Sequence, residues 1–214
     1  MNQEEFYDAF IMALQNKKVL EQLEKSMNQK LQRELADIKQ LLQERDDRIK
    51  VLEKKIDFLE SQNENLEQYT RRNSLRIYGM EESEHEDIFD AVIKLFQNDM
   101  DLETQPADID RIHRLGKKKS DGKPRPVIVK FATYRQRNFV FKAKSRLKNY
   151  SNGKVYVNED LTKERSNLFF AARKLKKEKK IQDAWTFDGR VIIKTRQGRI
   201  TTVGSLQQLD DAAK

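Results

Sequence analysis

Apolar residues in the first third of the chain recur at alternating steps of four and three. The repeat runs through Leu31, Leu35, Ile38, Leu42, Ile49, Leu52, Ile56, Leu59 and Leu66. With Leu35 at heptad position a, nine of the eleven a and d positions from residue 31 to residue 66 are apolar, and no Gly or Pro interrupts them. The pattern predicts a coiled coil within residues 1–70. A single amphipathic helix packed on its own domain is the alternative, but the rest of the chain has little apolar surface to cover it.

Two polar residues interrupt this repeat, Arg45 at a d position and Asn63 at an a position. Polar residues at such positions fix the register of a coiled coil at some cost in stability. Upstream, Leu20, Leu23 and Met27 keep the same spacing but are one residue out of phase. We therefore expect a stutter near Met27, or a separate short helix.

The residues beside the repeat bear on the number of chains. Ile at position a with Leu at position d favours a parallel dimer. The segment Arg48–Glu53 instead resembles the Arg-apolar-x-x-apolar-Glu pattern of trimeric coiled coils, and Lys55–Glu60 repeats it with Lys in place of Arg. We expect a homotrimer, with a dimer as the second choice. The residues predicted to mediate self-association are Leu35, Ile38, Leu42, Arg48, Ile49, Leu52, Glu53, Ile56, Leu59, Asn63 and Leu66.

Residues 71–159 switch between the two-residue period of strands and the helical period. The predicted elements are strands at 74–79, 109–115, 127–131 and 154–158, and helices at 88–96 and 134–147. In the first strand Leu75 and Ile77 face inward, whereas Arg76 and Tyr78 face outward. The order β-α-β-β-α-β predicts the ferredoxin-like fold of RNA-recognition (RRM-like) modules, whose exposed sheet receives unstacked bases.

Residues 160–214 predict a second, smaller α+β domain. A basic amphipathic helix spans 161–181, and strand-like segments at 185–187, 190–195 and 199–203 follow it. Asp188-Gly189 and Gln197-Gly198 separate the three segments, and both pairs are strong hairpin signals. A domain of roughly 50 residues is marginal alone, so we expect it to lean on residues 71–159.

The distribution of charge along the chain indicates what kind of partner it binds. The formal net charge of the chain is +8, but residues 71–214 carry 32 Lys and Arg against 20 Asp and Glu. Between Arg111 and Arg199 there are 27 basic residues against 7 acidic ones. Such an excess of one sign indicates a polyanionic partner.

Several classes of protein are not expected from the composition. The chain has no cysteine, which fits a reducing compartment, either cytoplasmic or nuclear. No apolar run approaches the roughly 18 residues of a membrane helix, and the start of the chain does not resemble a secretory signal. The two histidines, His85 and His113, lie in unrelated segments, so no metal site is expected. No phosphate-binding loop or catalytic constellation is present, and we expect neither catalysis, nor a cofactor, nor a small-molecule substrate.

The order of coiled coil, RRM-like module and small basic domain resembles the first open reading frame protein of long-interspersed-element (LINE) retrotransposons. The residues that carry the resemblance are Arg71–Gly79 (RRNSLRIYG), Ile109–Leu115 (IDRIHRL), Pro126–Phe131 (PVIVKF) and Leu161–Arg165 (LTKER). The resemblance implies a homotrimeric nucleic-acid chaperone for transposition, which packages the element's RNA into cytoplasmic ribonucleoprotein particles, with a nuclear location as an alternative. It also implies that the strand is gripped between the two small domains, and no catalysis. One departure is that Pro126 and Ile128 stand where RNA-recognition modules carry stacking aromatics.

The candidate contacts to single-stranded RNA or DNA are mainly basic. They are Arg71, Arg72, Asn73, Arg76, Tyr78, Arg111, His113, Lys117, Lys118, Lys119, Arg125, Lys130, Arg135, Arg137, Arg165, Arg173, Lys174, Arg190 and Arg196.

Alternatives exist for several of these residues. Arg111 and His113 share one face of their strand, and Arg114 faces the other way unless a bulge intervenes. Nuclear-import recognition is an alternative for the Lys117–Lys119 loop, and a solvated helix face for 135–148. For the whole chain, the alternative is a coiled-coil adaptor whose basic region binds a protein or a membrane.

Overall fold

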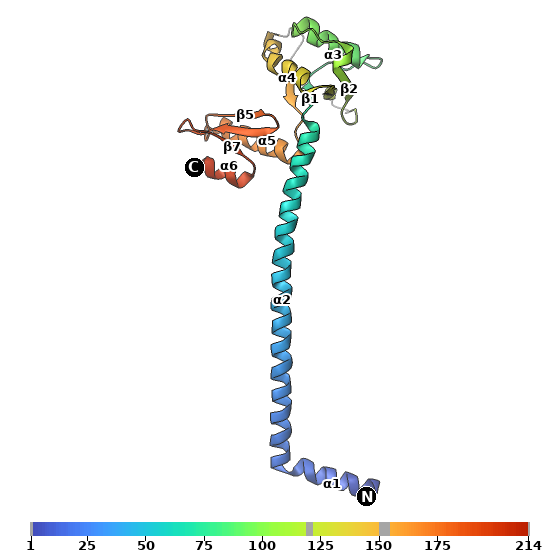
Figure 1. The fold of residues 1–214 in the computed structure, drawn as a ribbon, viewed down its shortest axis with the longest axis vertical. Helices are drawn as coiled ribbons and strands as arrows, with labels where there is room; N and C mark the ends of the chain where they lie inside the picture. The colour runs from blue at the N-terminus through green and yellow to red at the C-terminus, as the bar shows by residue number, and fades with distance from the viewer. Residues whose placement is uncertain (1, 119–121, 150–154, 214) are drawn as a thin grey trace. The chain divides into compact units, whose positions relative to one another are not determined.

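The computed structural model describes residues 2–118, 122–149 and 155–213. The chain divides into two compact units, Met1–Glu60 and Ser61–Lys214. Figure 1 draws the chain as a ribbon and labels most of its helices and strands.

The N-terminal region consists of two helices, α1 (Gln3–Gln15) and α2 (Lys17–Arg71). Asn2 caps α1, where its Oδ1 accepts the Glu5 N–H at 2.8 Å and the Glu5 carboxylate accepts the Asn2 N–H at 3.0 Å. The helices separate at Asn16, whose backbone is extended (φ −80°, ψ 109°). The long helix predicted from the heptads is therefore confirmed. It runs unbroken through Met27, so Leu20, Leu23 and Met27 belong to this helix and not to a separate short one.

The apolar repeat of α2 is exposed in the part of the chain that the structure describes. The exposed fraction of its apolar side chains ranges from 49% at Leu52 to 63% at Leu66. Asn63, Arg48 and Glu53, the polar residues predicted beside them, are also exposed or partly exposed. Apolar stripes of this length normally become buried by association with other helices.

The second unit contains a four-stranded antiparallel sheet. Its strands are β1 (Ser74–Tyr78), β2 (Ile109–Arg114), β3 (Val127–Phe131) and β4 (Tyr156–Glu159), in the order β2-β3-β1-β4. Two helices lie between these strands in sequence, α3 (Ile88–Lys94) and α4 (Tyr134–Ala143). A π-helical turn, η1 (Leu95–Asp99), extends α3, and 3-10 turns occur at η2 (Pro106–Asp108) and η3 (Lys144–Asn149). Each element lies close to its predicted range.

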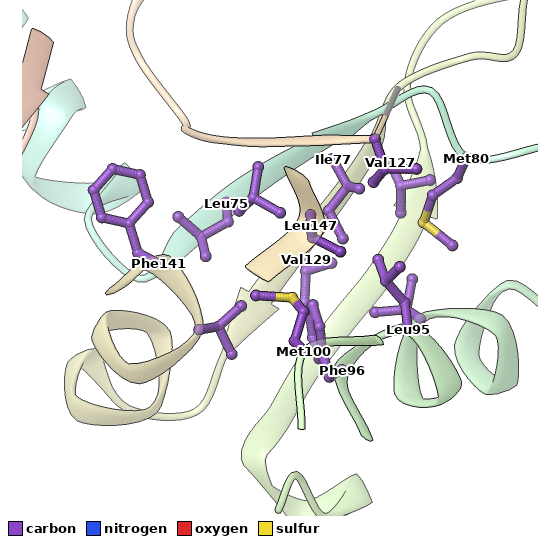
Figure 2. Packing of buried hydrophobic residues seen from close by; sticks show 14 of the residues in the cluster. Leu75, Ile77, Met80, Leu95, Phe96, Met100, Val127, Val129, Phe141 and Leu147 are labelled. Atoms are coloured by element: carbon purple, nitrogen blue, oxygen red, sulfur yellow. The ribbon is translucent and has the colours of Figure 1, made fainter. Parts of the chain in front are cut away.

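One face of this sheet carries the first hydrophobic core. Leu75, Ile77, Val127 and Val129 point from the strands to this face and are fully buried. Figure 2 shows them with Phe96 and Met100, which follow α3, and with Phe141 of α4. The period-two pattern of β1 and β3 therefore assigns their faces correctly, because the alternate residues Arg76, Tyr78, Ile128 and Lys130 are only partly buried or exposed.

The C-terminal region forms a second core around a three-stranded sheet. Helix α5 (Lys163–Lys177) is capped by Thr162 and packs Leu168 and Ala172 against β5 (Asp183–Phe187) and β6 (Arg190–Lys194). Strand β7 (Ile200–Val203) completes the order β5-β6-β7. A last helix, α6 (Leu206–Ala212), contributes the buried Leu209. The sequence pattern predicted the helix and the three strands, whereas α6 was not predicted.

The predicted hairpin between β5 and β6 turns at Asp188 and Gly189. Both have left-handed backbones, with φ of 50° and 72°. Two successive residues with positive φ are typical of the tight turns that join antiparallel strands, and the Asp-Gly pair tolerates this geometry.

Candidate nucleic-acid interface

The face of the four-stranded sheet opposite the core carries five of the predicted contact residues. Strand register aligns them in cross-strand rows, since directly opposed residues point to the same face. One row is His113–Ile128–Arg76–Asn158, a second is Arg111–Lys130–Ser74, and a third is Tyr78–Tyr156. We call these nine residues the outer sheet face. The structure thus brings together Arg76, Tyr78, Arg111, His113 and Lys130 from three strands.

A bulge near the start of β2 sets the second row. The register between β2 and β3 shifts between Ile109 and Arg111, after which Arg111 and His113 are both exposed. Arg114 points the other way and is 5% exposed, with its guanidinium bound to Glu86 at 2.6 Å. The expectation that Arg111 and His113 share a face, with Arg114 on the opposite one, agrees with the structure.

Lys130 has an acidic neighbour on the same surface. Its Nζ lies 2.8 Å from Oδ2 of Asp110, and both side chains are about half exposed. Its hydrogen bond and charge lower the pKa of Asp110 below the ordinary value. Exposed pairs of this kind are worth little, about 0–1 kcal/mol, so a phosphate can compete for Lys130.

Asp160 joins two of the predicted arginines. Arg76 Nε donates to its Oδ1 at 2.5 Å, and Arg71 Nη1 donates to its Oδ2 at 3.1 Å. The Asp160 side chain is 3% exposed, whereas each arginine side chain is 30% exposed. Arg71 also binds Glu67 at 2.7 Å. Asp160 therefore fixes both guanidinium groups at the junction of α2 and β1 while leaving part of each open.

Arg72 and Asn73 complete the junction. Arg72 is exposed, and its guanidinium carbon lies 3.9 Å from the centre of the Tyr69 ring. The side-chain Oδ1 of Asn73 is buried and has no hydrogen-bond partner within the described part of the chain.

The structure corrects the prediction made for Arg137. It was predicted to contact nucleic acid, but it is buried on the core side of the sheet. Its Nη2 lies 2.5 Å from Oε1 of Glu159, with 3% and 1% of the two side chains exposed. The Gly189 N–H also donates to this Glu159 oxygen at 3.3 Å. The role of Arg137 is therefore to neutralise a buried carboxylate.

Arg165, the preferred contact in the C-terminal domain, also proves to have structural partners. Its Nε donates to Glu64 at 3.0 Å, its Nη2 to Asn65 at 2.7 Å and its Nη1 to the Gly189 carbonyl at 3.1 Å. The three partners lie at the end of α2 and in the β5–β6 turn. Arg165 thus ties α5 to both, which leaves little of its donor capacity for a ligand.

Arg125 is likewise occupied. Its backbone N–H and its Nε each donate to the Glu82 carboxylate at 2.9 Å, and its Nη1 donates to the Gly116 carbonyl at 3.1 Å. The hydrogen bonds from the Arg125 side chain and backbone lower the pKa of Glu82 to about 2. Lys117 and Lys118 of the same loop are exposed, and Lys119 lies outside the described residues.

The remaining predicted contacts are exposed but scattered. Arg135 lies on α4, Arg173 and Lys174 lie on α5, and Arg190 begins β6. Arg196 follows β6, and its Nε donates to the Lys179 carbonyl at 2.8 Å. None of these belongs to the outer sheet face.

Sequence reasoning missed Tyr156, Asn158, Asp160 and Gln68. The alternation of β4 could have revealed Tyr156 and Asn158, because Val155 and Val157 are buried. No comparable signal exists for Gln68, which is 5% exposed on α2. Its Nε2 donates to the Asp160 carbonyl at 3.0 Å, and its Oε1 accepts the Thr162 N–H at 3.0 Å.

Within the described ranges, no group of three or more acidic or histidine side chains is placed to hold a metal ion. In the same part of the chain, no helix has the length and hydropathy needed to span a membrane. No protein-family model matches the chain, and a search of curated proteins finds no match.

Proposed function

We propose that this chain is a homotrimeric protein that binds single-stranded RNA and DNA without catalysis. In this proposal residues 71–159 form an RRM-like domain. The strand order β2-β3-β1-β4, with α3 and α4 between strands, supports this assignment because it is the order of a ferredoxin-like β-α-β-β-α-β unit. The biological role that follows from the resemblance to LINE proteins is that of a chaperone packaging retrotransposon RNA.

The observation that carries the proposal is the outer sheet face. Its cations Arg76, Arg111 and Lys130 share this face with Tyr78, and Arg111 and Lys130 are exposed there. Side chains of this kind are what a single strand needs, since cations hold its phosphates and aromatic rings stack its bases. A duplex would keep its bases inside the helix and use only the cations.

Self-association supports the same proposal through avidity. The exposed apolar repeat of α2 is suited to join three chains, which would present three outer sheet faces to one strand. After the first contact, later contacts become intramolecular and can raise the overall affinity by about a hundredfold to ten-thousandfold. Long strands should therefore bind much more tightly than short ones.

The test is to measure the mass of the full chain by light scattering and its binding to oligonucleotides by fluorescence anisotropy. We expect a trimer mass, tighter binding to single strands than to duplex, and a log affinity that falls by about 0.7 per phosphate contact against log salt. A monomer or dimer without strand preference would contradict the proposal. That result would favour an adaptor with a coiled coil and a basic partner-binding region.

A further inference from the structure

Tyr78 and Tyr156 are direct cross-strand neighbours at one end of the outer sheet face. They pair in the antiparallel register of β1 and β4. Opposed side chains in such a pair have Cβ atoms about 4.5–5.5 Å apart and point to the same side. Tyr156 is 53% exposed, and Tyr78 is partly exposed. The two phenol side chains therefore project from adjacent strands to the same side of the sheet, and both are at least partly exposed.

The exposure of Tyr156 has no explanation in the packing of β4. Its neighbours Val155 and Val157 are buried at 4% and 3% exposure, so the strand is correctly seated in the core. About half of the Tyr156 surface therefore stays in contact with water. The exposed part of the ring is therefore available for contact with a ligand.

The surroundings of the two tyrosines are polar and cationic. Arg76 and Asn158 occupy the adjacent row on the same two strands, and Arg111 and Lys130 lie further across the sheet. Ile128 is the one aliphatic side chain among the outward positions of the four described strands. A protein partner or second copy would need a broader apolar surface than this, whereas a single-stranded nucleic acid needs isolated rings among cations.

We infer that Tyr78 and Tyr156 form a stacking platform for unpaired bases, with Arg76, Arg111 and Lys130 holding the phosphates beside it. The inference rests on the proposed function. It adds Tyr156 to the contact residues of the proposed site. RNA-recognition modules stack bases on their third strand, but here the outward position at the start of β3 is Ile128. The bases would instead lie along the β1–β4 edge. Stacking discriminates weakly among bases, so this site tolerates any sequence.

Two ligands separate stacking from phosphate binding. Binding of the full chain is measured by anisotropy with an oligothymidine of about ten nucleotides, and with a strand of the same length and charge that lacks bases. Tyr156→Ala is expected to weaken binding of oligothymidine about 5- to 100-fold and to change binding of the abasic strand less than about twofold. Tyr156→Phe keeps the ring and should bind as the wild type does.

A control variant and a second measurement complete the test. Phe139→Ala removes an exposed aromatic ring from α4, outside the outer sheet face, and should leave the binding of both strands unchanged. Photocrosslinking with 5-bromodeoxyuridine in the strand should place adducts on Tyr78 or Tyr156.

The possible failures are distinguishable. If the wild-type chain binds neither strand, the proposed function fails and the platform with it. If it binds oligothymidine and Tyr156→Ala binds equally well, the platform alone is wrong. If Tyr156→Ala loses the same affinity for both strands, Tyr156 contributes to the fold or to backbone contacts. If Tyr156→Ala lowers the oligomer mass, this face mediates contacts between copies of the chain. Either of these results overturns the platform.

Discussion

The Cβ position of Gly189, in the turn between β5 and β6, lies 2.7 Å from Cγ of Gln68 near the end of α2. Gln68 cannot easily yield, because its amide holds both the Asp160 carbonyl and the Thr162 N–H. Only a residue without a side chain fits beside it. The turn, the β4–α5 connection and the end of α2 therefore meet at one tightly packed point.

Gly189→Ala should accordingly destabilise the C-terminal domain. The left-handed backbone costs an alanine about 1–2 kcal/mol, and the overlap with Gln68 adds about 1–3 kcal/mol. Gly198→Ala is a matched control, since Gly198 also has a positive φ but meets nothing within 4 Å. Urea unfolding followed by Trp185, the one tryptophan of the chain, should give the lower midpoint for Gly189→Ala. Equal midpoints for the two variants would show that the Gln68 contact is unimportant.

A phosphate contact by Arg111 should appear in the salt dependence. Arg111 is exposed on the edge strand β2, opposite Lys130, so Arg111→Gln removes one contact without disturbing the core. The slope of log affinity against log salt should become shallower by about 0.7 for a short single strand. Lys18→Gln on α2 removes the same charge elsewhere and should leave the slope unchanged. A similar change in slope for both variants would indicate a general charge effect.

Substitutions in the Arg137–Glu159 pair should change the stability of the fold and not the affinity for single strands. Arg137→Met leaves the Glu159 carboxylate buried without its partner, which costs about 3–5 kcal/mol. Arg137→Met with Glu159→Met removes both charges and should recover most of the unfolding temperature in calorimetry. The double variant should also bind single strands as tightly as the wild type. Loss of affinity in a stable double variant would restore Arg137 as a contact residue.

Periodicity predicted the elements well because each element depends on its own residues. The alternation of Leu75 with Ile77 and of Val127 with Val129 assigned β1 and β3 to the core correctly. The Asp188-Gly189 pair likewise identified its hairpin. These signals are local, so one sequence is sufficient to read them.

The sequence did not reveal which arginines are exposed and which form ion pairs within the fold. Arg137 and Arg165 are as basic as Arg111, but their partners Glu159 and Glu64 lie 22 and 101 residues away. Whether a cation is free depends on which carboxylate the fold brings beside it. The sequence therefore predicted part of the outer sheet face, but it did not reveal that Arg137 and Arg165 form ion pairs within the fold.

The Glu82–Arg125 contact should make stability fall in acid. The hydrogen bonds from Arg125 lower the pKa of Glu82 from 4.5 to about 2 in the folded chain. A carboxyl whose pKa is lower in the folded than in the unfolded state stabilises the fold above its unfolded pKa and loses this effect as it becomes protonated. The difference in urea midpoint between wild type and Glu82→Gln should be constant above about pH 5 and shrink between about pH 4.5 and 2. Glu84→Gln, at a nearby exposed position, should show no such trend.

Self-association should depend on the apolar repeat and not on α2 as a whole. Ile56→Asn places a polar amide at an a position and should lower the oligomer mass in sedimentation equilibrium at micromolar concentration. Lys54→Asn introduces the same side chain on the opposite side of the helix and should leave the mass unchanged. Because avidity requires several chains, Ile56→Asn should weaken binding to a long strand far more than binding to a strand of about ten nucleotides. Equal losses on the two strands would show that the assembly contributes nothing to the binding of long RNA.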